Sequence, residues 1–254
     1  MKKQPIMKKI LLTAIAIFAL GIPGTKATNL TVVTAEAVPS IQKEVEAYMN
    51  VDEFNEIVLD LVASVKFVQS DRSYIEAKGP ERLIKRTDVD VKGGVMTVAF
   101  EKGENIKFRR GEKLQITIYS PSITRLEFKG VVNFKAPETV ETPILEIVSD
   151  GVGNINFSDL QCKKLIVSSE GVGNITLKGN TDSAVYKSDG VGTIYAYEMI
   201  SKVTNVSLNG VGGVQCYASE QGDFINNGIG NISYQGDPKV EHINSPGIGK
   251  VRKK

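Results

Sequence analysis

The chain has 254 residues, of which 41% are hydrophobic and 24% are charged, and this composition excludes a disordered chain. Its 24 glycines fall at wide intervals, which excludes a collagen-like structure. The formal net charge is only +2. The basic clusters at 107–110, 163–164 and 252–254 are short and scattered, so we expect no nucleic-acid binding.

The first 27 residues have the features of a secretory signal peptide. Four lysines among the first nine residues precede an apolar run at 10–22, which is too short to span a bilayer, and a small-residue cleavage site follows at 25–27. A second site at 35–37 leaves the cleavage point uncertain by about ten residues. Cleavage after Ala27 removes five lysines and no acids, so the formal charge changes from +2 to −3. We expect an exported protein of the periplasm, the cell surface or the extracellular space, without a membrane span.

Residues 28–52 are expected to form a linker with a short helix from Ile41 to Met49. The part from 53 to 125 has the two-residue period of strands, and its glycines mark turns. The expected strands cover residues 57–68, 74–78, 83–91, 95–100 and 114–119. A solenoid needs a terminus that hides its open end. We therefore interpret 53–125 as the N-terminal cap and first coils of one domain that extends from 53 to 254, with a small separate β-domain as the alternative.

Residues 126–254 contain a repeated Gly-Val-Gly or Gly-Ile-Gly motif, first complete in Asp150-Gly151-Val152-Gly153-Asn154-Ile155. The first glycines are Gly151, Gly171, Gly190, Gly210, Gly228 and Gly247, and the second are Gly153, Gly173, Gly192, Gly212, Gly230 and Gly249. The intervals are 20, 19, 20, 18 and 19 residues, and a degenerate copy begins at Gly130. Such spacing is typical of a solenoid, because each coil must return to the same corner.

Aligning the copies on the first glycine gives columns of similar apolar residues. Four residues after it are Ile155, Ile175, Ile194, Val214, Ile232 and Val251; two further on are Phe157, Leu177, Ala196, Cys216 and Tyr234; four residues before it are Ile147, Val167, Tyr186, Val206, Phe224 and Ile243. Polar residues fall between the columns, which is the two-residue period of strands with one buried side. The fold class is therefore all-β, a parallel β-helix (solenoid) with about 19–20 residues per coil.

The corner that contains the two glycines is expected to be a turn. Asp-Gly and Asn-Gly pairs favour turns because glycine reaches positive φ, and the second glycine permits close approach between stacked coils. We expect the Val or Ile between the glycines to point inward and fill the corner. Asn154, Asn174 and Asn231 share one position, which predicts an asparagine ladder along the stack. A dinucleotide-binding loop is excluded, since that loop occurs once and opens a helix.

The acidic residues before the glycines are candidates for chemistry. Asp150, Glu170 and Asp189 are expected to form a carboxylate row on the outer surface, and we interpret them as turn residues because Asn209 and other non-acidic residues fill the same place. The single histidine, His242, has no visible partner for a metal site. We expect no metal, no cofactor and no catalytic residue.

Tyrosines and cysteines give two further expectations. Tyr195, Tyr197 and Tyr217 are the candidates for stacking on a sugar or contacting a protein. Cys162 and Cys216 lie three coils apart, which is roughly 14 Å at a strand spacing of about 4.8 Å and beyond the reach of a disulfide. We expect two free thiols, with Cys216 buried in the core.

With these motifs the chain resembles the putative auto-transporter adhesin family with the head GIN domain. The family pattern of Ser-Gly-small-Gly-Asp/Asn before an apolar strand is similar to Asp150–Ile155 and its successors, and Asp52 to Val68 resembles the family's start. The resemblance covers roughly residue 53 to the C-terminus. It implies a right-handed parallel β-helix and an adhesin-like role, although Val or Ile stands here where the family often has Ser or Ala.

We expect a non-catalytic structural or binding module of the cell envelope that presents β-helix faces to a glycan or an envelope protein. The alternative is a polysaccharide-cleaving enzyme, which needs two carboxylates at about 5–10 Å, or a base with a metal or arginine. A homo-oligomer would shield the open coil at the C-terminus. A transporter barrel needs at least about eight strands, and seven residues follow Gly247, so we do not expect the chain to transport itself.

Overall fold

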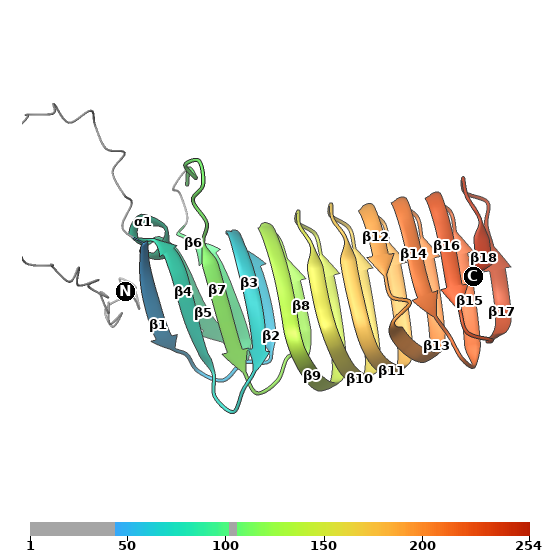
Figure 1. Cartoon of the computed structure of the whole chain (residues 1–254), viewed down its shortest axis with the longest axis horizontal. Helices are drawn as coiled ribbons and strands as arrows, with labels where there is room; N and C mark the ends of the chain where they lie inside the picture. Colours follow the sequence, from blue (N-terminus) through green and yellow to red (C-terminus); the bar gives the residue numbers. More distant parts are fainter. Residues whose placement is uncertain (1–43, 102–105) are drawn as a thin grey trace, which may run out of the picture.

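The structure, a computed structural model, describes residues 44–101 and 106–254. Its strands wind into coils that stack along one long axis (Figure 1). The expected signal peptide at 1–27 and most of the expected linker at 28–52 lie outside the described residues. Within the described residues, no helix is long and apolar enough to cross a membrane.

The coils of the repeat part have two broad faces. The first face consists of the beginnings of β9 (Val131–Ser149), β10 (Ile155–Ser169) and β11 (Ile175–Ser188), followed by β12 (Val191–Tyr195), β14 (Val211–Tyr217), β16 (Ile229–Gln235) and β18 (Val251–Lys253). The second face consists of the ends of β9, β10 and β11, followed by β13 (Met199–Leu208), β15 (Gln221–Asn226) and β17 (Lys239–Asn244). All these pairings are parallel. A bend joins the two faces at one edge of the molecule, and the glycine corner joins them at the other.

The strand register places equivalent residues of successive coils beside each other, which confirms the columns that the repeat predicted. On the first face Ile155 pairs with Ile175, and Ile175 pairs with Ile194. On the second face Val167 pairs with Tyr186. These side chains are all buried. Like residues therefore stack on like residues, and this stacking keeps the coil length nearly constant.

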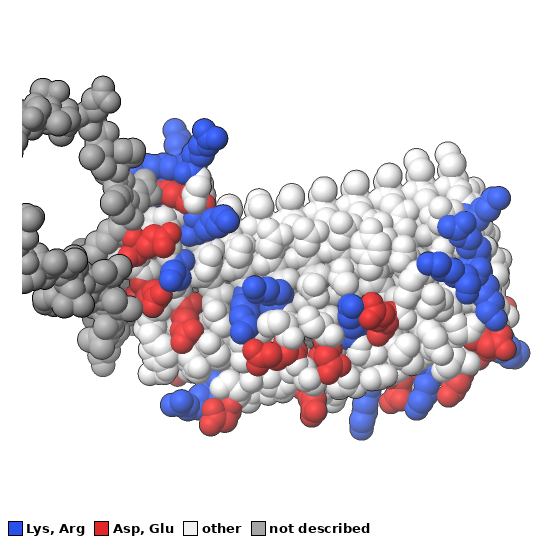
Figure 2. Space-filling view, in the orientation of Figure 1, with Lys and Arg blue, Asp and Glu red and all other residues white. Residues whose placement is uncertain are grey.

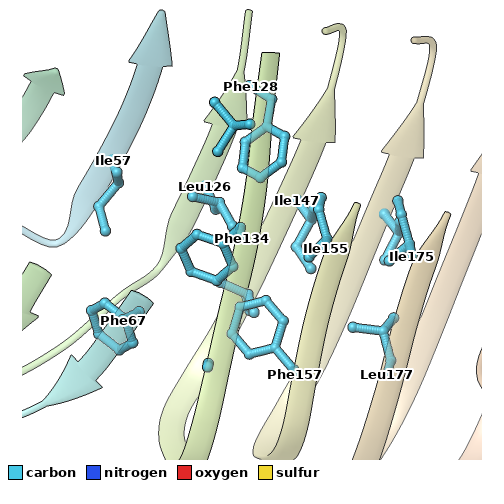
Figure 3. Close-up of a cluster of buried hydrophobic side chains, with 14 of the residues drawn as sticks. Ile57, Phe67, Leu126, Phe128, Phe134, Ile147, Ile155, Phe157, Ile175 and Leu177 are labelled. Atoms are coloured by element: carbon cyan, nitrogen blue, oxygen red, sulfur yellow. The ribbon is translucent and has the colours of Figure 1, made fainter. Parts of the chain in front are cut away.

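The buried side chains of both faces form one continuous core along the axis (Figure 3). Aromatic rings lie near each other inside it: the ring centroids of Phe128 and Phe134, on the two faces of one coil, are 6.0 Å apart, and those of Phe134 and Phe157, in successive coils, are 5.4 Å apart. Ile57 and Phe67 belong to the same core. The N-terminal part therefore shares its core with the repeat part.

The N-terminal part consists of β1 (Glu44–Asn50), β2 (Glu56–Asp60), β3 (Val62–Gln69), β4 (Tyr74–Pro80), α1 (Glu81–Ile84), β5 (Thr87–Lys92), β6 (Val95–Phe100), β7 (Gln115–Ser120) and β8 (Arg125–Phe128). The coil of β2 and β3 lies between the coil of β6 and β7 and the coil of β8 and β9. The order of coils along the axis thus differs from the order in the chain. The connection from β7 to β8 passes Phe54 and Asn55, whose carbonyls accept hydrogen bonds from Ser120 Oγ at 2.9 Å and Thr124 N at 2.7 Å.

Antiparallel strands close the N-terminal end of the solenoid. On the first face β1 pairs with β4, and β4 pairs with β7; on the second face β5 pairs with β6. The expected helix from Ile41 to Met49 is wrong for its described residues, which belong to β1. Their inward and outward side chains alternate, and pairing with β4 outweighs the helix preference of the Glu, Ala and Met residues.

The expected strand at 83–91 is also partly wrong. Leu83 and Ile84 lie in α1, and β5 begins only at Thr87. Proline is tolerated at a helix start, and here Pro80 precedes the first turn. Both helix residues are buried. The short helix therefore carries two apolar side chains over the open end of the core.

The side chain between the two glycines points outward, so the expected inward plug is wrong. Val152, Val172 and Val191 are each about half exposed. Side chains alternate along the strand that follows, and Ile155 points inward. Backbone packing fills the corner instead: a Cβ added at Gly173 would lie 1.7 Å from the carbonyl oxygen of Gly153. Positive φ occurs at the second glycine of each copy, such as Gly173 at 147°, and not at the first.

The asparagine ladder is present, and it combines an amide–amide bond with bonds from backbone N–H groups to amide oxygens. Asn154 Nδ2 donates to Asn133 Oδ1 at 3.2 Å. Asn154 Oδ1 accepts a hydrogen bond from the backbone N–H of Asn174 at 3.0 Å, and Asn174 Oδ1 accepts one from Thr193 N at 2.9 Å. Each side chain thus ties one coil to the backbone of the next.

Both cysteines are free and Cys216 is buried, which confirms the two expectations about thiols.

Candidate functional site

A shallow groove of about 780 Å³ follows the bend over successive coils. We call it the bend groove. One small residue per coil lies at its floor: Thr142, Cys162, Thr181 and Ser201. The strand register stacks these four residues, so the floor rises by about 4.8 Å per coil. With Ser219 and Glu220 of the next coil, the groove is about 19 Å long.

Hydroxyl groups in the floor hold the bend in shape. Thr142 Oγ1 donates to the carbonyl of Ile144 at 3.0 Å, and Thr181 Oγ1 donates to the carbonyl of Ser183 at 3.1 Å. A hydroxyl oxygen that donates its hydrogen still has lone pairs. The floor therefore offers hydroxyl acceptors at Thr142 and Thr181, two coils apart, with the Cys162 thiol between them.

The two rims of the bend groove carry different chemistry. Gln161 and Asn180 contribute amides to one rim, and Asn180 Nδ2 donates to Gln161 Oε1 at 3.1 Å. The other rim carries Lys163, Asp182 and Lys202, all exposed. Lys202 Nζ lies 2.7 Å from Asp182 Oδ1. The hydrogen bond and the charge of Lys202 hold the pKa of Asp182 below its ordinary value, so this carboxylate is a hydrogen-bond acceptor at neutral pH.

The thiol in the groove is not set up as a nucleophile. Partial burial raises the pKa of Cys162, and the hydrogen bond with Thr181 opposes that rise without cancelling it. Reactive cysteines have a lowered pKa, because the thiolate is the attacking species. Cys162 therefore acts as a small neutral part of the floor.

The ionisable groups of the described part lack the pattern of an acid catalyst. A glycosidase needs a carboxylic acid with a raised pKa. The carboxyls whose pKa clearly departs from the ordinary value are Glu127, Asp182, Asp189 and Asp237, and all four shifts are downward. Among the described residues, no group of three His, Cys, Asp or Glu side chains is arranged to hold a metal.

The acidic row before the glycines lies along the corner, on the opposite edge from the bend groove. Asp150 and Glu170 are exposed, whereas Asp189 is half-buried. Partial burial alone would raise the pKa of Asp189, but hydrogen bonds from Lys187 and Asn209 together hold it below the ordinary value. Asn209 Nδ2 donates to Asp189 Oδ1 at 2.6 Å. Lys187 lies on the preceding strand and Asn209 lies in the next coil, so these are not the local backbone hydrogen bonds of a turn residue, and the turn interpretation of the row stays a prediction. His242 is exposed on β17.

The three candidate tyrosines lie on the outer side of the first face and not in the bend groove. Tyr195 is exposed, and Tyr197 and Tyr217 are half-buried. Lys254 Nζ lies 5.0 Å from the centre of the Tyr197 ring, so this ring already has a cationic neighbour. The structure places the three on one face, with Tyr195 and Tyr197 in one coil and Tyr217 in the next.

A second aromatic group was not foreseen. Tyr48, Tyr74 and Tyr119 come from β1, β4 and β7. The ring centroids of Tyr48 and Tyr74 are 5.1 Å apart, and those of Tyr74 and Tyr119 are 4.1 Å apart. Tyr119 donates to Glu76, and burial together with this carboxylate raises the pKa of Tyr119 to about 12. The three rings are brought together only by the antiparallel pairing of the cap, which the sequence did not reveal.

Comparison with known protein families matches residues 53–238 to the family described as "Putative auto-transporter adhesin, head GIN domain". The chain belongs to this family. The match confirms the resemblance in the glycine repeat and covers most of the chain, including the N-terminal coils whose glycines do not repeat. No curated protein sequence matches the chain.

Solved structures of similar proteins have the same fold. A putative adhesin from Bacteroides fragilis is 31% identical with a TM-score of 0.81, and the similarity covers 84% of this chain and 98% of that one. A putative lipid binding protein from Parabacteroides distasonis is 21% identical with a TM-score of 0.69, over 84% and 98% of the two chains. A putative adhesin from Parabacteroides merdae is 22% identical with a TM-score of 0.62, over 84% and 97%. The last two show the fold alone.

Proposed function

We propose that this protein is an exported, non-catalytic binding module of the cell envelope, adhesin-like in role, whose bend groove holds an extended glycan. The observation that carries the proposal is the groove itself. It runs along successive coils for about 19 Å and is lined by amides, hydroxyls and side chains of both charges. An extended polar chain can occupy such a groove over several of its units.

The lining favours a glycan over a lipid. An acyl chain is recognised by predominantly apolar side chains, whereas the bend groove offers Gln161, Asn180, Asp182 and Lys202. Both charges are present in nearly equal number, so a neutral sugar chain fits better than a strongly anionic one. The lipid-binding description of the Parabacteroides distasonis structure applies to that protein, with which this chain shares the fold.

Binding without turnover is the expected outcome, because the one clear pKa shift of a groove carboxyl is downward. Asp182 is the groove carboxylate with a clear shift, and its pKa is lowered by Lys202. A cleaving enzyme would need a carboxylic acid with a raised pKa to protonate the leaving oxygen. The polysaccharide-cleaving alternative is therefore weaker than a binding role.

The test is a glycan array probed with the purified exported chain, with a hydrolysis assay on every glycan that is retained. We expect retention without release of shorter products. The double variant Asn180→Ala/Lys202→Ala should weaken binding about tenfold, since it removes hydrogen-bonding groups from both rims.

The matched control is Asn205→Ala/Lys187→Ala, which removes an exposed amide and a lysine that pairs with Asp189, both on the outer side of the second face and outside the groove lining. We expect no change in binding. Equal affinity of both double variants would rule out the groove as the site. Loss of binding in Tyr195→Ala alone would move the site to the first face, and product release would restore the enzyme alternative.

The proposed location is the periplasm or the outside of the cell. Fractionation of cells that express the full chain, followed by protease treatment of intact cells, distinguishes the two. Digestion of the protein in intact cells would place it on the surface. Recovery of uncleaved precursor in the cytoplasm would contradict export.

A further inference from the structure

Aliphatic side chains form a continuous row on the outside of the glycine corner. We define the aliphatic ridge as Val131, Val152, Val172, Val191, Val211, Ile229 and Ile248. Each is between 46% and 72% exposed, and each forms a parallel bridge to the next. The corner lies at the upper margin of the molecule in Figure 1, and that margin carries no Lys, Arg, Asp or Glu over most of its length in Figure 2.

The ridge differs from the other outward rows of the same face. The row five residues after the first glycine is Asn156, Thr176, Tyr195, Gln215, Ser233 and Arg252; the row seven residues after it is Ser158, Lys178, Tyr197, Tyr217, Gln235 and Lys254. Those rows change chemical class from coil to coil, whereas the ridge is Val or Ile throughout. β-branched residues suit any outward strand position, so strand preference does not account for a uniform aliphatic row at this one.

We propose that the aliphatic ridge is the contact surface between two copies of this chain, which lie antiparallel across a two-fold axis. A partner for the ridge must present apolar groups about every 4.8 Å along a straight edge. A second copy of the chain has the same spacing, because it carries the same ridge. The two rows of side chains interdigitate, as in the dry contacts between stacked strands.

The exposed area fits a dimer of modest affinity. The six ridge residues from Val152 to Ile248 leave on the order of 500 Å² of apolar surface per copy, which is large for a monomer. Contact between two copies removes on the order of 1,000 Å² in total, close to the lower limit of specific interfaces. Polar residues beside the ridge supply the rim. A dissociation constant on the order of micromolar is expected for such an interface.

The residues beside the ridge select one register. Directly before the first glycines stand Asp150, Glu170, Asp189, Asn209, Asn227 and Pro246. Carboxylates thus occupy one half of the row and uncharged residues the other half. When Val191 lies opposite the partner's Val211, antiparallel order places each carboxylate opposite an uncharged residue of the partner. A register centred on Val191 would instead set Asp189 against the partner's Asp189, which like-charge repulsion disfavours.

The ridge can be changed without disturbing the coils. The backbone N–H groups of Val172, Val191 and Val211 each donate to a glycine carbonyl of the preceding coil at 2.9 Å, and the side chains point to solvent. Threonine keeps the β-branched shape and the strand preference, while it replaces a methyl group with a hydroxyl. Substitution of valine by threonine therefore separates association from folding.

The experiment is sedimentation velocity of the exported chain over a concentration series from low micromolar to hundreds of micromolar. We expect the native chain to change from monomer to dimer. The triple variant Val172→Thr/Val191→Thr/Val211→Thr should raise the dissociation constant at least thirtyfold with a nearly unchanged melting temperature. A control triple variant in the outward row five residues after the first glycines, Asn156→Ser/Thr176→Ser/Gln215→Ser, should leave the dissociation constant unchanged.

Cysteine cross-linking tests the register in a Cys162→Ser background, where the remaining Cys216 is buried. Val172→Cys and Ile229→Cys chains are oxidised separately and as a mixture. The proposed arrangement gives covalent dimers in the mixture and not in either chain alone. A native chain that stays monomeric, a triple variant that dimerises normally, or efficient self-cross-linking of Val172→Cys would each overturn the proposal.

Discussion

The N-terminal coils and the repeat coils pack on their neighbouring coils in different ways. In the repeat, every coil turns at a glycine corner, and the backbone of one coil lies directly on that of the next. In the part before β8, no such series of corners exists. There the coil of β2 and β3 sits between two coils that come later in the chain, and antiparallel strands complete the end.

This difference shows what the paired glycines accomplish. Because the two glycines of the corner lack Cβ atoms, each coil can pack directly on the preceding one, so the order of the coils in the chain and in space agrees. Where larger residues form the corners, long-range pairing and side-chain contacts decide which coil lies next to which. The repeat part should therefore be sensitive to small changes at the corner, and the N-terminal part should be sensitive to loss of specific side-chain contacts.

Gly212→Ala tests the corner and has the largest expected effect. A Cβ at Gly212 would lie 1.8 Å from the carbonyl oxygen of Gly192, and the backbone there has a φ of 141°. We expect a loss of more than about 4 kcal/mol of unfolding free energy, measured by urea unfolding. Gly111→Ala in the N-terminal part, where no atom of the described residues lies within 4 Å of the added Cβ, should cost only about 1–2 kcal/mol. Equal costs would contradict the packing role of the corner.

Glu112→Gln tests a specific contact of the N-terminal part. Arg82 pairs with Glu112, whose side chain is 5% exposed, and the Glu112 carboxylate also accepts a hydrogen bond from Arg109 N at 2.7 Å. Loss of one partner of a largely buried pair should cost about 3 kcal/mol, measured by thermal and urea unfolding. Glu241→Gln, which breaks an exposed pair with Lys239 in the last coil, should change stability by less than about 0.5 kcal/mol. A cost that small for Glu112→Gln would show that the contact is dispensable.

Tyr186→Phe should stabilise the repeat part. The Tyr186 ring is fully buried, its hydroxyl has no hydrogen-bond partner among the described residues, and burial raises its pKa well above the ordinary value. Removal of an unsatisfied buried hydroxyl should raise the unfolding free energy by about 1 kcal/mol. The control is Tyr119→Phe in the N-terminal part, which loses the bond to Glu76 and should lower stability slightly. A loss of stability in Tyr186→Phe would mean that the hydroxyl is satisfied in solution.

The pH dependence of Glu127 gives the smallest effect, at the junction of the two parts. Hydrogen bonds from Lys129 and, to a lesser degree, from Arg125 lower its pKa below 4.5, against the opposing effect of partial burial. Because the folded state has the lower pKa, the stabilisation is present above the unfolded value and is lost as pH falls through the folded value. Glu127→Gln should cost less than about 1 kcal/mol at neutral pH, and urea unfolding near pH 3 should show a smaller difference. An unchanged difference at acid pH would contradict this assignment.

The sequence was sufficient for the parts of the fold that repeat. The columns that contain Ile155 and Val167 emerged from alignment on the glycines, because residues stacked in space must then recur in sequence. The same regularity placed Cys162 and Cys216 too far apart for a disulfide. The direction of Val152 was predicted wrongly, although continuing the alternation back from Ile155 would have placed it outside.

The remaining features depend on contacts that leave no local pattern. β1 and the exchanged coil of β2 and β3 are determined by pairing between distant residues. Alignment on the glycines did not reveal the bend groove, because its floor residues lie at a variable distance from the first glycine. Thr142, Cys162 and Thr181 stand 12, 11 and 10 residues after the first glycine of their coils. The distance changes where the strand register shifts after Phe157. A search for stacked residues that allowed such shifts would have found the floor.

The exchanged order of the first coils sets the route by which the chain folds. β2 obtains one neighbour when residues 95–99 arrive and the other when residues 125–128 arrive, so two long loops must close before this block is complete. Loop closure costs entropy and slows folding, whereas each later coil needs only the twenty or so residues just before it. We therefore expect the N-terminal block to form in the rate-limiting step and to serve as the template on which the remaining coils are added from the N-terminal side.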